Sequence, residues 1–537
     1  MKKFLLFFLL LGAATASAQI RNADTDKQKK AVSTGEIKPG ELPGKIIKHQ
    51  EPARGEKVKY GPYLPDMNSL RTHPCPEWFR DAQFGMLIDW GLYSVAGWAP
   101  KKEKGAMYPD WFMSDMVYNA AYKEYVEKNY GKNFKPDDFI PMFTAENYQP
   151  EKLMQLAADA GMKYVIPFCK HHDGFCLWPS TYTGRNAMDM GPRRDLVRPL
   201  VDECNRIGLK FGFYFSVEEH RTPMIINGEK TVRRWKDNRY GDVNVNNPYE
   251  PWDPNPANIK VNMSGKYFIE GDFFTDYIVP QAKEFIDMYD PDILWFDGEW
   301  KMRPEELHTP DIISYFYNQA EGRKEVANND RNGRVRFMSG DFYCSEYHQI
   351  PDKLKFAHPW EENRGISQSF GYNWQDTEEN VISTKDFIEM LVRTVSENGN
   401  LLLIVNLDGK GALPEVQERR LREIGAWLKV NGEAIYGSRP CQTTEQDDGK
   451  IRFTQSKDGK NIYVICTDFP QNKLIIRHNL VYLGKNSKIT LLGAKNNTLE
   501  WTQFDDGWGD TKLEISVPES LYSQRQNEYA WVFKIML

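Results

Sequence analysis

An apolar run at residues 293–296 ends at Asp297, and Gly298 follows it at once. An apolar strand has no structural use for a carboxylate at its tip, so Asp297 is a candidate for chemistry as well as for a helix cap or a loop hydrogen bond. Cleavage of a sugar acetal needs one carboxylate to stabilise or capture the oxocarbenium-like centre and a second carboxyl group to protonate the leaving oxygen. Spacing alone does not select the second acid. Glu299, on the same strand face, is the nearest candidate, and Glu residues on other loops are equally admissible.

Polar side chains also lie at the ends of three other apolar runs. Asp89 ends one run, the stretch 170–173 (KHHD) follows a second, and Tyr214 lies near the end of a third. If these runs are parallel strands of a barrel, their C-terminal ends share one face, and barrels of this kind carry their active sites there. The sequence therefore predicts one site built from four strand ends.

His171 and His172 are the first candidates for metal ligands. Adjacent residues on a strand point to opposite faces, so we expect the two imidazoles not to chelate one ion together. No Cys or further His stands at a ligand spacing beside them, and none of the seven Cys belongs to a CxxC pair. The pattern predicts no metal and no cofactor, and it favours a role for both imidazoles as donors to substrate hydroxyls.

The elements that would position these side chains are short apolar runs alternating with helical stretches between residues 75 and 437. Near-continuous apolar runs are typical of parallel strands buried on both faces. The predicted strands are 84–89, 163–169, 209–215, 292–297 and 400–406, and the predicted helices are 150–161, 193–207 and 414–432. Repeated strand–helix units favour an α/β fold, a TIM-like (β/α)₈ barrel with insertions, and a doubly wound sheet is the competing architecture.

After Pro440 apolar and polar residues alternate, as in 451–453, 462–466 and 513–517, with Asp-Gly turn signals between them. This pattern is typical of antiparallel strands and predicts a C-terminal antiparallel β-sandwich. We therefore divide the chain into a signal peptide (1–18), a linker or N-terminal arm (19–70), a catalytic barrel (71–437) and a sandwich (441–537).

The N-terminus predicts export. It has two lysines, an apolar stretch too short to span a bilayer, and a small-residue site at 16–18, so we expect cleavage after Ala18 and a periplasmic or secreted protein. No later run is long enough for a membrane helix, so membrane insertion is not expected. Nothing in the sequence indicates the oligomeric state.

The composition narrows the class of partner. A net charge of −6, spread along the chain, argues against nucleic acid. Aromatic residues make up 13% of the chain, with 15 Trp, which suits stacking on sugar rings as well as packing in a large core.

Several recognisable motifs follow one another along the predicted barrel. They are QFGMLIDWGLYSV, KYVIPFCKHHDGFCLWPS, GLKFGFYFS, YDPDILWFDG, WEENRGISQSFGYN and ENGNLLLIVNLDGKGALP. In these motifs the chain resembles the α-L-fucosidases of glycoside hydrolase family 29. The resemblance implies a (β/α)₈-type barrel with a C-terminal β-sandwich. It also implies a retaining exo-glycosidase that hydrolyses terminal α-L-fucosyl residues of oligosaccharides or polysaccharides without a cofactor.

The resemblance also implies roles for individual residues. Asp297 takes the place of the family's nucleophile. In the segment NNDRNGRVRFMSGDFYCSEYH, Glu346 takes the place of the acid/base, with Glu299 as the fallback and Glu361 and Glu362 behind it. The sugar contacts implied by the resemblance are Asp89, Asp110, Trp111, His171, His172, Tyr214, Trp295 and Arg331.

Two positions depart from the family pattern. The family normally has His-Trp-Gly where this chain has Asp89-Trp90-Gly91, and many members have Glu-Trp where it has Asp110-Trp111. A neutral imidazole donates one hydrogen bond and accepts one, whereas an ionised carboxylate only accepts. The hydroxyl pattern recognised at this corner should therefore differ, unless a shifted loop lets water fill the gap. The alternatives are a glycosidase for a related sugar such as α-L-galactose and a non-catalytic carbohydrate-binding protein.

Overall fold

The computed structural model describes residues 61–219, 224–226, 229–231, 273–298, 300, 302–334, 336, 339–347, 350–477, 482–495, 498–505, 511–524 and 528–537. The predicted signal peptide and most of the predicted linker lie outside these residues, and so does Glu299.

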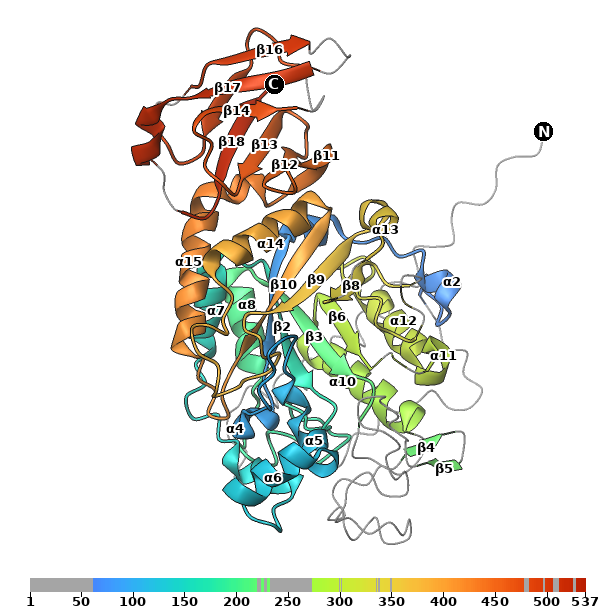
Figure 1. The fold of residues 1–537 in the computed structure, drawn as a ribbon. Coiled ribbons are helices and arrows are strands. Elements are labelled where there is room, and N and C mark those ends of the chain that lie inside the picture. Colours follow the sequence, from blue (N-terminus) through green and yellow to red (C-terminus); the bar gives the residue numbers. More distant parts are fainter. Residues whose placement is uncertain are drawn as a thin grey trace, which may run out of the picture.

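Within the described residues, eight strands form one parallel sheet in the order β7-β6-β3-β2-β1-β10-β9-β8. A parallel bridge between Asn329 and Phe342 joins the two outermost strands, and the Asp341 amide donates to the Asn328 carbonyl at 2.7 Å beside it. The sheet therefore closes into a barrel (Figure 1). Its strands are β1 (Phe84–Asp89), β2 (Tyr164–Lys170), β3 (Lys210–Ser216), β6 (Ile293–Asp297), β7 (Ala327–Asn328), β8 (Tyr343–Glu346), β9 (Trp360–Gly365) and β10 (Gly399–Asn406).

A buried aspartate holds the seam between β7 and β8. The Asp341 carboxylate contacts His73 Nδ1 at 2.8 Å and accepts hydrogen bonds from the Tyr317 hydroxyl at 2.9 Å and the Asn328 amide at 2.8 Å. The His73 ring also stacks on Tyr317. The first described segment of the chain is thereby tied to the place where the barrel closes.

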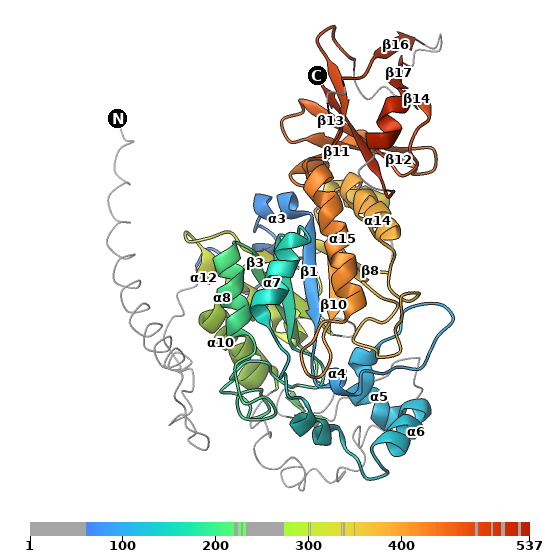
Figure 2. The same ribbon diagram turned by 90° about the vertical axis from the view of Figure 1, so that its left-hand side faces the viewer.

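Helices cover the outside of the barrel, as Figures 1 and 2 show. The longer ones are α7 (Pro150–Asp159), α8 (Arg198–Ile207), α10 (Val279–Tyr289), α12 (Thr309–Ala320), α14 (Thr384–Ser396) and α15 (Glu415–Asn431). The others are α2 (Met67–Leu70), α3 (Glu77–Ala82), α4 (Tyr93–Ala96), α5 (Phe112–Tyr118), α6 (Ala120–Asn129), α11 (Pro304–Leu307), α13 (Asp352–Ala357), η1 (Pro109–Trp111), η2 (Pro136–Met142), η3 (Phe274–Ile278), η4 (Gly432–Ala434) and η5 (Glu519–Gln524). A two-stranded hairpin, β4 (Met224–Ile226) and β5 (Glu229–Thr231), stands apart from the barrel sheet. Among the described helices, none has the length and apolar character needed to cross a membrane.

The predicted helices are present, and the structure corrects one boundary. α8 begins at Arg198 and not at 193. The Asp195 carboxylate accepts hydrogen bonds from the amides of Val197 and Arg198 at 2.8 and 2.9 Å, which fixes the turn that leads into the helix. α8 ends at Gly208, whose φ of +88° stops the helix. The five predicted strands are found as β1, β2, β3, β6 and β10, whereas β7, β8 and β9 were not predicted.

The C-terminal part consists of two antiparallel sheets, which confirms the predicted sandwich. Their strand orders are β11-β12-β13-β18-β15 and β14-β17-β16. The strands are β11 (Ser438–Gln446), β12 (Ile451–Ser456), β13 (Asn461–Cys466), β14 (Asn472–Ile476), β15 (Lys488–Leu491), β16 (Trp501–Asp505), β17 (Thr511–Val517) and β18 (Trp531–Met536). The Trp427 indole on α15 donates to the Ala530 carbonyl at 2.9 Å. The sandwich packs at the end of the barrel opposite α4–α6, which follow the C-terminal end of β1 (Figures 1 and 2).

Candidate active site

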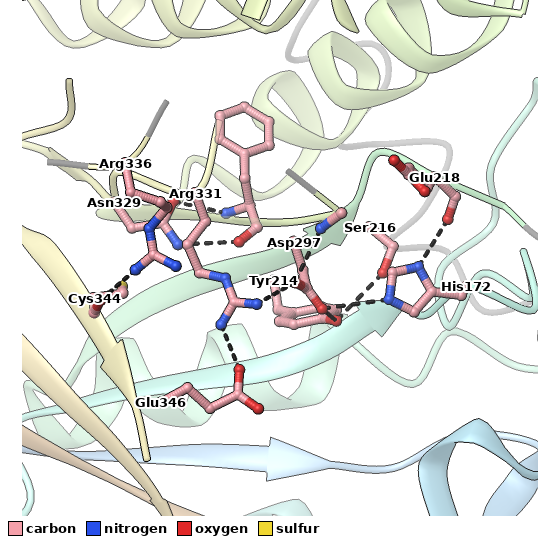
Figure 3. Close-up of polar contacts among 12 residues, drawn as sticks. His172, Tyr214, Ser216, Glu218, Asp297, Asn329, Arg331, Arg336, Cys344 and Glu346 are labelled. Carbon is pink, nitrogen blue, oxygen red and sulfur yellow. Dashed lines mark hydrogen bonds and ion pairs between the residues drawn. The ribbon is translucent and has the colours of Figure 1, made fainter. Parts of the chain in front are cut away.

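Asp297 ends β6, and its side chain is held from several directions (Figure 3). The Tyr214 hydroxyl on β3 donates to Oδ2 at 2.6 Å, and Arg331 and the Gly298 amide donate to Oδ1 at 2.7 and 2.9 Å. Burial raises the pKa of Asp297, but Arg331, His172 and Tyr214 outweigh it and hold this pKa below its ordinary value. The carboxylate is therefore ionised and oriented, as a nucleophile must be.

Gly298 lets the chain turn directly after this carboxylate. Its φ is +103°, in the region that favours glycine, and a Cβ there would lie 3.0 Å from the Glu218 side chain. Any larger residue would strain the turn that places Asp297.

Arg331 connects the two proposed catalytic carboxyl groups. One terminal nitrogen donates to Asp297 Oδ1 and the other to Glu346 Oε2, both at 2.7 Å. Both nitrogens belong to one rigid planar group, so the two contacted oxygens are at most about 8 Å apart. This limit includes the separation of roughly 5–5.5 Å that is typical of retaining glycosidases. Glu346 ends β8, and its side chain is 23% exposed, so it faces the open side of this arrangement.

The loop that carries Arg331 is fixed on both sides. The Asn329 amide group accepts from the Phe296 amide and donates to the Phe296 carbonyl, at 3.0 Å each, which ties the loop to β6. The Asp330 carboxylate accepts from the Cys344 amide at 2.8 Å, which ties it to β8. Arg331 is thereby placed between the ends of the two strands that supply Asp297 and Glu346.

His172 approaches Asp297 from the opposite side. Its Nδ1 lies 2.9 Å from the Glu218 carbonyl, and because a carbonyl only accepts, Nδ1 carries a hydrogen. Its Nε2 lies 3.4 Å from Asp297 Oδ2. The neighbouring His171 stacks on Phe168, and burial, with the nearby His172, lowers the pKa of His171. Both imidazoles lie close to the Asp297 carboxylate.

The expectation that His171 and His172 point apart is wrong. Their ring centroids are 4.5 Å apart, and one ligand atom from each, with one from Asp297, lie within 4.8 Å of one another. The reason is that β2 ends at Lys170 and the chain then turns, with the Gly174 amide donating to the His171 carbonyl at 3.0 Å. The alternation of side chains along a strand no longer applies there. The distances would allow a metal ion, but the Glu218 carbonyl engages His172, and Arg331 and Tyr214 engage Asp297.

Asp89 and Asp110 form a buried acidic corner near His171. Asp89 Oδ1 accepts from the Tyr93 hydroxyl at 2.6 Å, and Asp110 Oδ2 lies 3.8 Å from His171 Nε2. Burial raises the pKa of Asp89, which the Tyr93 hydrogen bond partly offsets, and burial with the charge of Asp89 raises the pKa of Asp110. Tyr93 was not predicted as a site residue, although it stands four residues after Asp89 on the first turn of α4.

Two indole rings lie beside the buried His172 ring. The Trp111 centroid lies 5.2 Å from that of His172, and the Trp300 centroid lies 5.1 Å from it. Trp300 is 37% exposed, so an indole surface is available at the rim. Trp300 was not predicted as a site residue, and the available signal was its position three residues after the strand-end carboxylate of Asp297.

The remaining predicted residues, Trp295, Glu361 and Glu362, make no direct contact with Asp297 among the hydrogen bonds described above. The Trp295 indole donates to Glu361 Oε1 at 2.9 Å, and the Tyr164 hydroxyl donates to Glu361 Oε2 at 2.6 Å. Glu361 has no exposed surface, so it is not placed to protonate a leaving group. Glu362 pairs with Arg364. Of the acid/base candidates within the described residues, Glu346 is the one that shares a cation with Asp297.

Known proteins resemble this chain over most of its length. The model of the family described as alpha-L-fucosidase matches residues 52–433, and that of the alpha-L-fucosidase C-terminal domain matches residues 444–536. The chain is 30% identical to human tissue alpha-L-fucosidase over 484 residues, which cover 88% of this chain and 91% of that protein.

Two solved structures extend the comparison. Thermotoga maritima alpha-fucosidase in complex with fucose is 32% identical, with a TM-score of 0.69, over 88% of this chain and all of that one. Alpha-L-fucosidase isoenzyme 1 from Paenibacillus thiaminolyticus is 25% identical, with a TM-score of 0.64, over 86% of this chain and 98% of that one. These matches confirm the resemblance seen in the motifs, and the chain belongs to the α-L-fucosidase family, glycoside hydrolase family 29.

Proposed function

We propose that the protein is a retaining exo-acting α-L-fucosidase in which Asp297 is the nucleophile and Glu346 the acid/base. The observation that carries the assignment is the shared guanidinium of Arg331, which contacts both carboxyl groups at 2.7 Å. Retaining hydrolysis needs two carboxyl groups on opposite sides of one anomeric carbon. The family membership supports the same reaction.

In the first half of the reaction, an oxygen of Asp297 attacks the anomeric carbon and the bond to the leaving oxygen breaks. Glu346, in its protonated form, transfers its proton to that leaving oxygen. The result is a glycosyl ester on Asp297, and Glu346 is left ionised. Arg331 and Tyr214 fix Asp297 for this attack, because both donate to its oxygens.

In the second half, Glu346 accepts a proton from water, and the water oxygen attacks the same carbon. The ester bond to Asp297 breaks, the sugar leaves with net retention, and Glu346 is protonated again. His171 and His172 bind sugar hydroxyls beside Asp297 in this proposal. The indoles of Trp111 and Trp300 lie beside His172 and offer surfaces for the C–H faces of the sugar.

The experiment is hydrolysis of an aryl α-L-fucoside by the purified protein, followed by NMR of the first product. We expect α-L-fucose to appear first and the β anomer to grow later by mutarotation. Initial release of the β anomer would overturn the double displacement. Saturable binding of L-fucose without hydrolysis would favour the non-catalytic carbohydrate-binding alternative.

Two variants test the roles proposed for the two carboxyl groups. Asp297→Ala should abolish turnover of every substrate. Glu346→Ala should slow release from a fucosylated disaccharide by about 10²- to 10⁴-fold, and should slow an aryl fucoside with a good leaving group much less. Glu321→Ala, at an exposed position after α12, is the matched control and should keep full activity. Equal losses on both substrate types for Glu346→Ala would end the acid/base assignment.

The acidic corner gives a reason to test a second sugar. Asp89 stands where the family normally has His, and its buried carboxyl group already accepts a hydrogen bond from Tyr93. An aryl α-L-galactoside differs from the fucoside by one hydroxyl group, which a carboxylate can accept from. A higher kcat/KM for the galactoside than for the fucoside would favour the alternative of a related sugar.

We infer export from the N-terminal leader, with cleavage after Ala18. The natural substrates would then be fucosylated oligosaccharides or polysaccharides met in the periplasm or outside the cell, with neither nucleic acid nor membrane insertion involved. Mass spectrometry of the protein made from the full-length sequence tests this. A mature N-terminus at position 19 is expected, and an intact leader in the cytoplasm would contradict it.

A further inference from the structure

The carboxyl group of Glu361 lies inside the barrel, and the proposed reaction does not use it. Glu361 is on β9 and has no exposed surface. Its contacts cross the barrel to β2 and β6, so its side chain points into the interior. A buried carboxyl group is costly unless its oxygens are hydrogen-bonded, so its partners indicate what it does.

Each oxygen of Glu361 accepts one hydrogen bond. Oε1 accepts from the Trp295 indole at 2.9 Å, and Oε2 accepts from the Tyr164 hydroxyl at 2.6 Å. The two donors differ in kind. A hydroxyl can turn and accept from another group, whereas an indole nitrogen only donates. The Trp295 ring therefore depends on Glu361 for its position, whereas the Tyr164 hydroxyl can form a hydrogen bond with another group instead.

Trp295 in turn contacts the groups that hold the nucleophile. The centre of the Arg331 guanidinium lies 5.1 Å from the Trp295 ring centroid, within range of a cation–π interaction. The Tyr214 ring stacks on the Trp295 ring, with centroids 5.4 Å apart and planes at 21°. Arg331 and Tyr214 are the two side chains that donate to Asp297 at 2.7 and 2.6 Å.

We propose that Glu361 is a positioning residue, which acts through the Trp295 indole to place the Arg331 guanidinium between Asp297 and Glu346. A carboxylate accepting from the indole fixes the ring plane and increases the electron density that faces the guanidinium. The contacts run from Glu361 through Trp295 to Arg331, and from Arg331 to Asp297 and Glu346. The inference rests on the roles proposed above for Asp297 and Glu346.

A double-mutant cycle tests whether Glu361 acts through Trp295. Glu361→Gln keeps the shape and one acceptor but removes the charge, and Trp295→Phe removes the indole donor. With an aryl α-L-fucoside at pH 8, above the Glu361 pKa of about 7, we expect kcat to fall about tenfold for Glu361→Gln and more for Trp295→Phe. In the double variant, Glu361→Gln should cause no further fall, because the partner through which it acts is gone. A full multiplication of the two losses would overturn the proposal.

Tyr164→Phe is the matched control, because it removes the other hydrogen bond to the same carboxyl group. It should leave kcat within about twofold of wild type if the path runs through Trp295. A loss equal to that of Glu361→Gln would show that the carboxyl group matters only for the barrel interior, and would overturn the proposal. Thermal unfolding of each variant shows whether a loss of kcat comes from unfolding or from a displaced Trp295 ring. A folded Glu361→Gln protein with the kcat of wild type would also overturn the proposal.

Calorimetric binding of L-fucose gives a readout that does not depend on turnover. Glu361→Gln should weaken L-fucose binding several-fold and Tyr164→Phe should not. Wild-type protein that binds L-fucose but does not hydrolyse fucosides would refute the proposed function, while the binding series would still decide the role of Glu361. Unchanged affinity in Glu361→Gln would count against the positioning role alone.

Discussion

Arg331 donates to Asp297 through one terminal nitrogen and to Glu346 through the other, at 2.7 Å in each case. The cation thus joins the end of β6 to the end of β8. A lysine ammonium is a compact point charge and does not span two carboxyl groups in this way. Arg331→Lys should therefore lower kcat on an aryl α-L-fucoside by about 10²- to 10³-fold, the usual effect of removing one preorganised donor.

The control for Arg331→Lys is Arg323→Lys, because Arg323 also binds a carboxylate through two nitrogens, at Asp290, but on the surface. Its activity should equal that of wild type. Retention of more than a tenth of the activity in Arg331→Lys would refute the idea that one cation must serve both carboxyl groups.

Removing the Tyr214 hydroxyl should change how activity depends on pH. The hydroxyl donates to Asp297 at 2.6 Å and helps to lower the pKa of that carboxyl group against the opposing effect of burial. In Tyr214→Phe the pKa of Asp297 rises, so a larger fraction is protonated and inactive at low pH. The acidic limb of kcat/KM should move to higher pH, measured with an aryl fucoside from pH 3 upward. An unmoved limb would mean that Asp297 does not need this donor to stay ionised.

Glu361 makes stability depend on pH. Burial raises the pKa of Glu361 to about 7, against the opposing hydrogen bonds from Tyr164 and Trp295. Between its ordinary pKa and about 7, the folded protein holds a proton that the unfolded chain has released. Stability therefore falls as pH rises through this window, by about 3 kcal/mol in total.

Glu361→Gln should remove this contribution, since an amide does not titrate. Urea unfolding at pH 5 and pH 8 checks it: wild type should lose more stability than Glu361→Gln between the two values. Parallel curves for the two proteins would show that Glu361 keeps one protonation state throughout.

Chelators should leave the reaction untouched. His171, His172 and Asp297 are close enough to suggest a metal site, but Glu218, Arg331 and Tyr214 already engage two of them. Dialysis against EDTA should leave kcat unchanged. Loss of activity that Zn²⁺ restores would make the three residues a metal centre and would overturn the sugar-binding role proposed for the imidazoles.

The barrel seam should be sensitive to one aspartate. Asp341 contacts His73, Tyr317 and the amide of Asn328, and all three contacts are lost in Asp341→Ala. Leaving buried donors without acceptors costs about 1–3 kcal/mol each, so we expect a loss of roughly 3 kcal/mol or more in urea unfolding. Tyr317→Phe removes one of the three donors and should cost about 1 kcal/mol. Equal costs for the two variants would show that the aspartate acts through Tyr317 alone.

The strands that could be predicted from the sequence are those that build the apolar part of the barrel. β1, β2, β3, β6 and β10 are buried on both faces and contain apolar runs, so pattern and burial agree. β7 has two residues, which is too short for any periodic signal. β8 (YCSE) and β9 (WEENRG) contain polar residues because they face the site and the interior hydrogen bonds, and these polar residues hide the strand signal.

The same difference between apolar and polar segments explains which site residues could be predicted from the sequence pattern and which could not. Asp297, Tyr214 and His172 could be found because each follows an apolar run, and the structure brings them together. Arg331 and Glu346 lie on a loop and a polar strand, so spacing did not reveal them and only the family resemblance did. The partnership of Glu361 with Trp295 joins strands far apart in sequence, and no local pattern encodes it.

The connection between β7 and β8 closes the barrel through the bridge of Asn329 with Phe342, and the same connection carries Arg331. The connection that closes the barrel through this bridge thus also carries the arginine that contacts both proposed catalytic carboxyl groups. Partial loosening there would separate the two acids while the surrounding helices persist. On heating, activity should therefore be lost at a lower temperature than the helical structure. Inactivation would then measure the opening of this one connection, and the melting temperature would measure the unfolding of the whole protein.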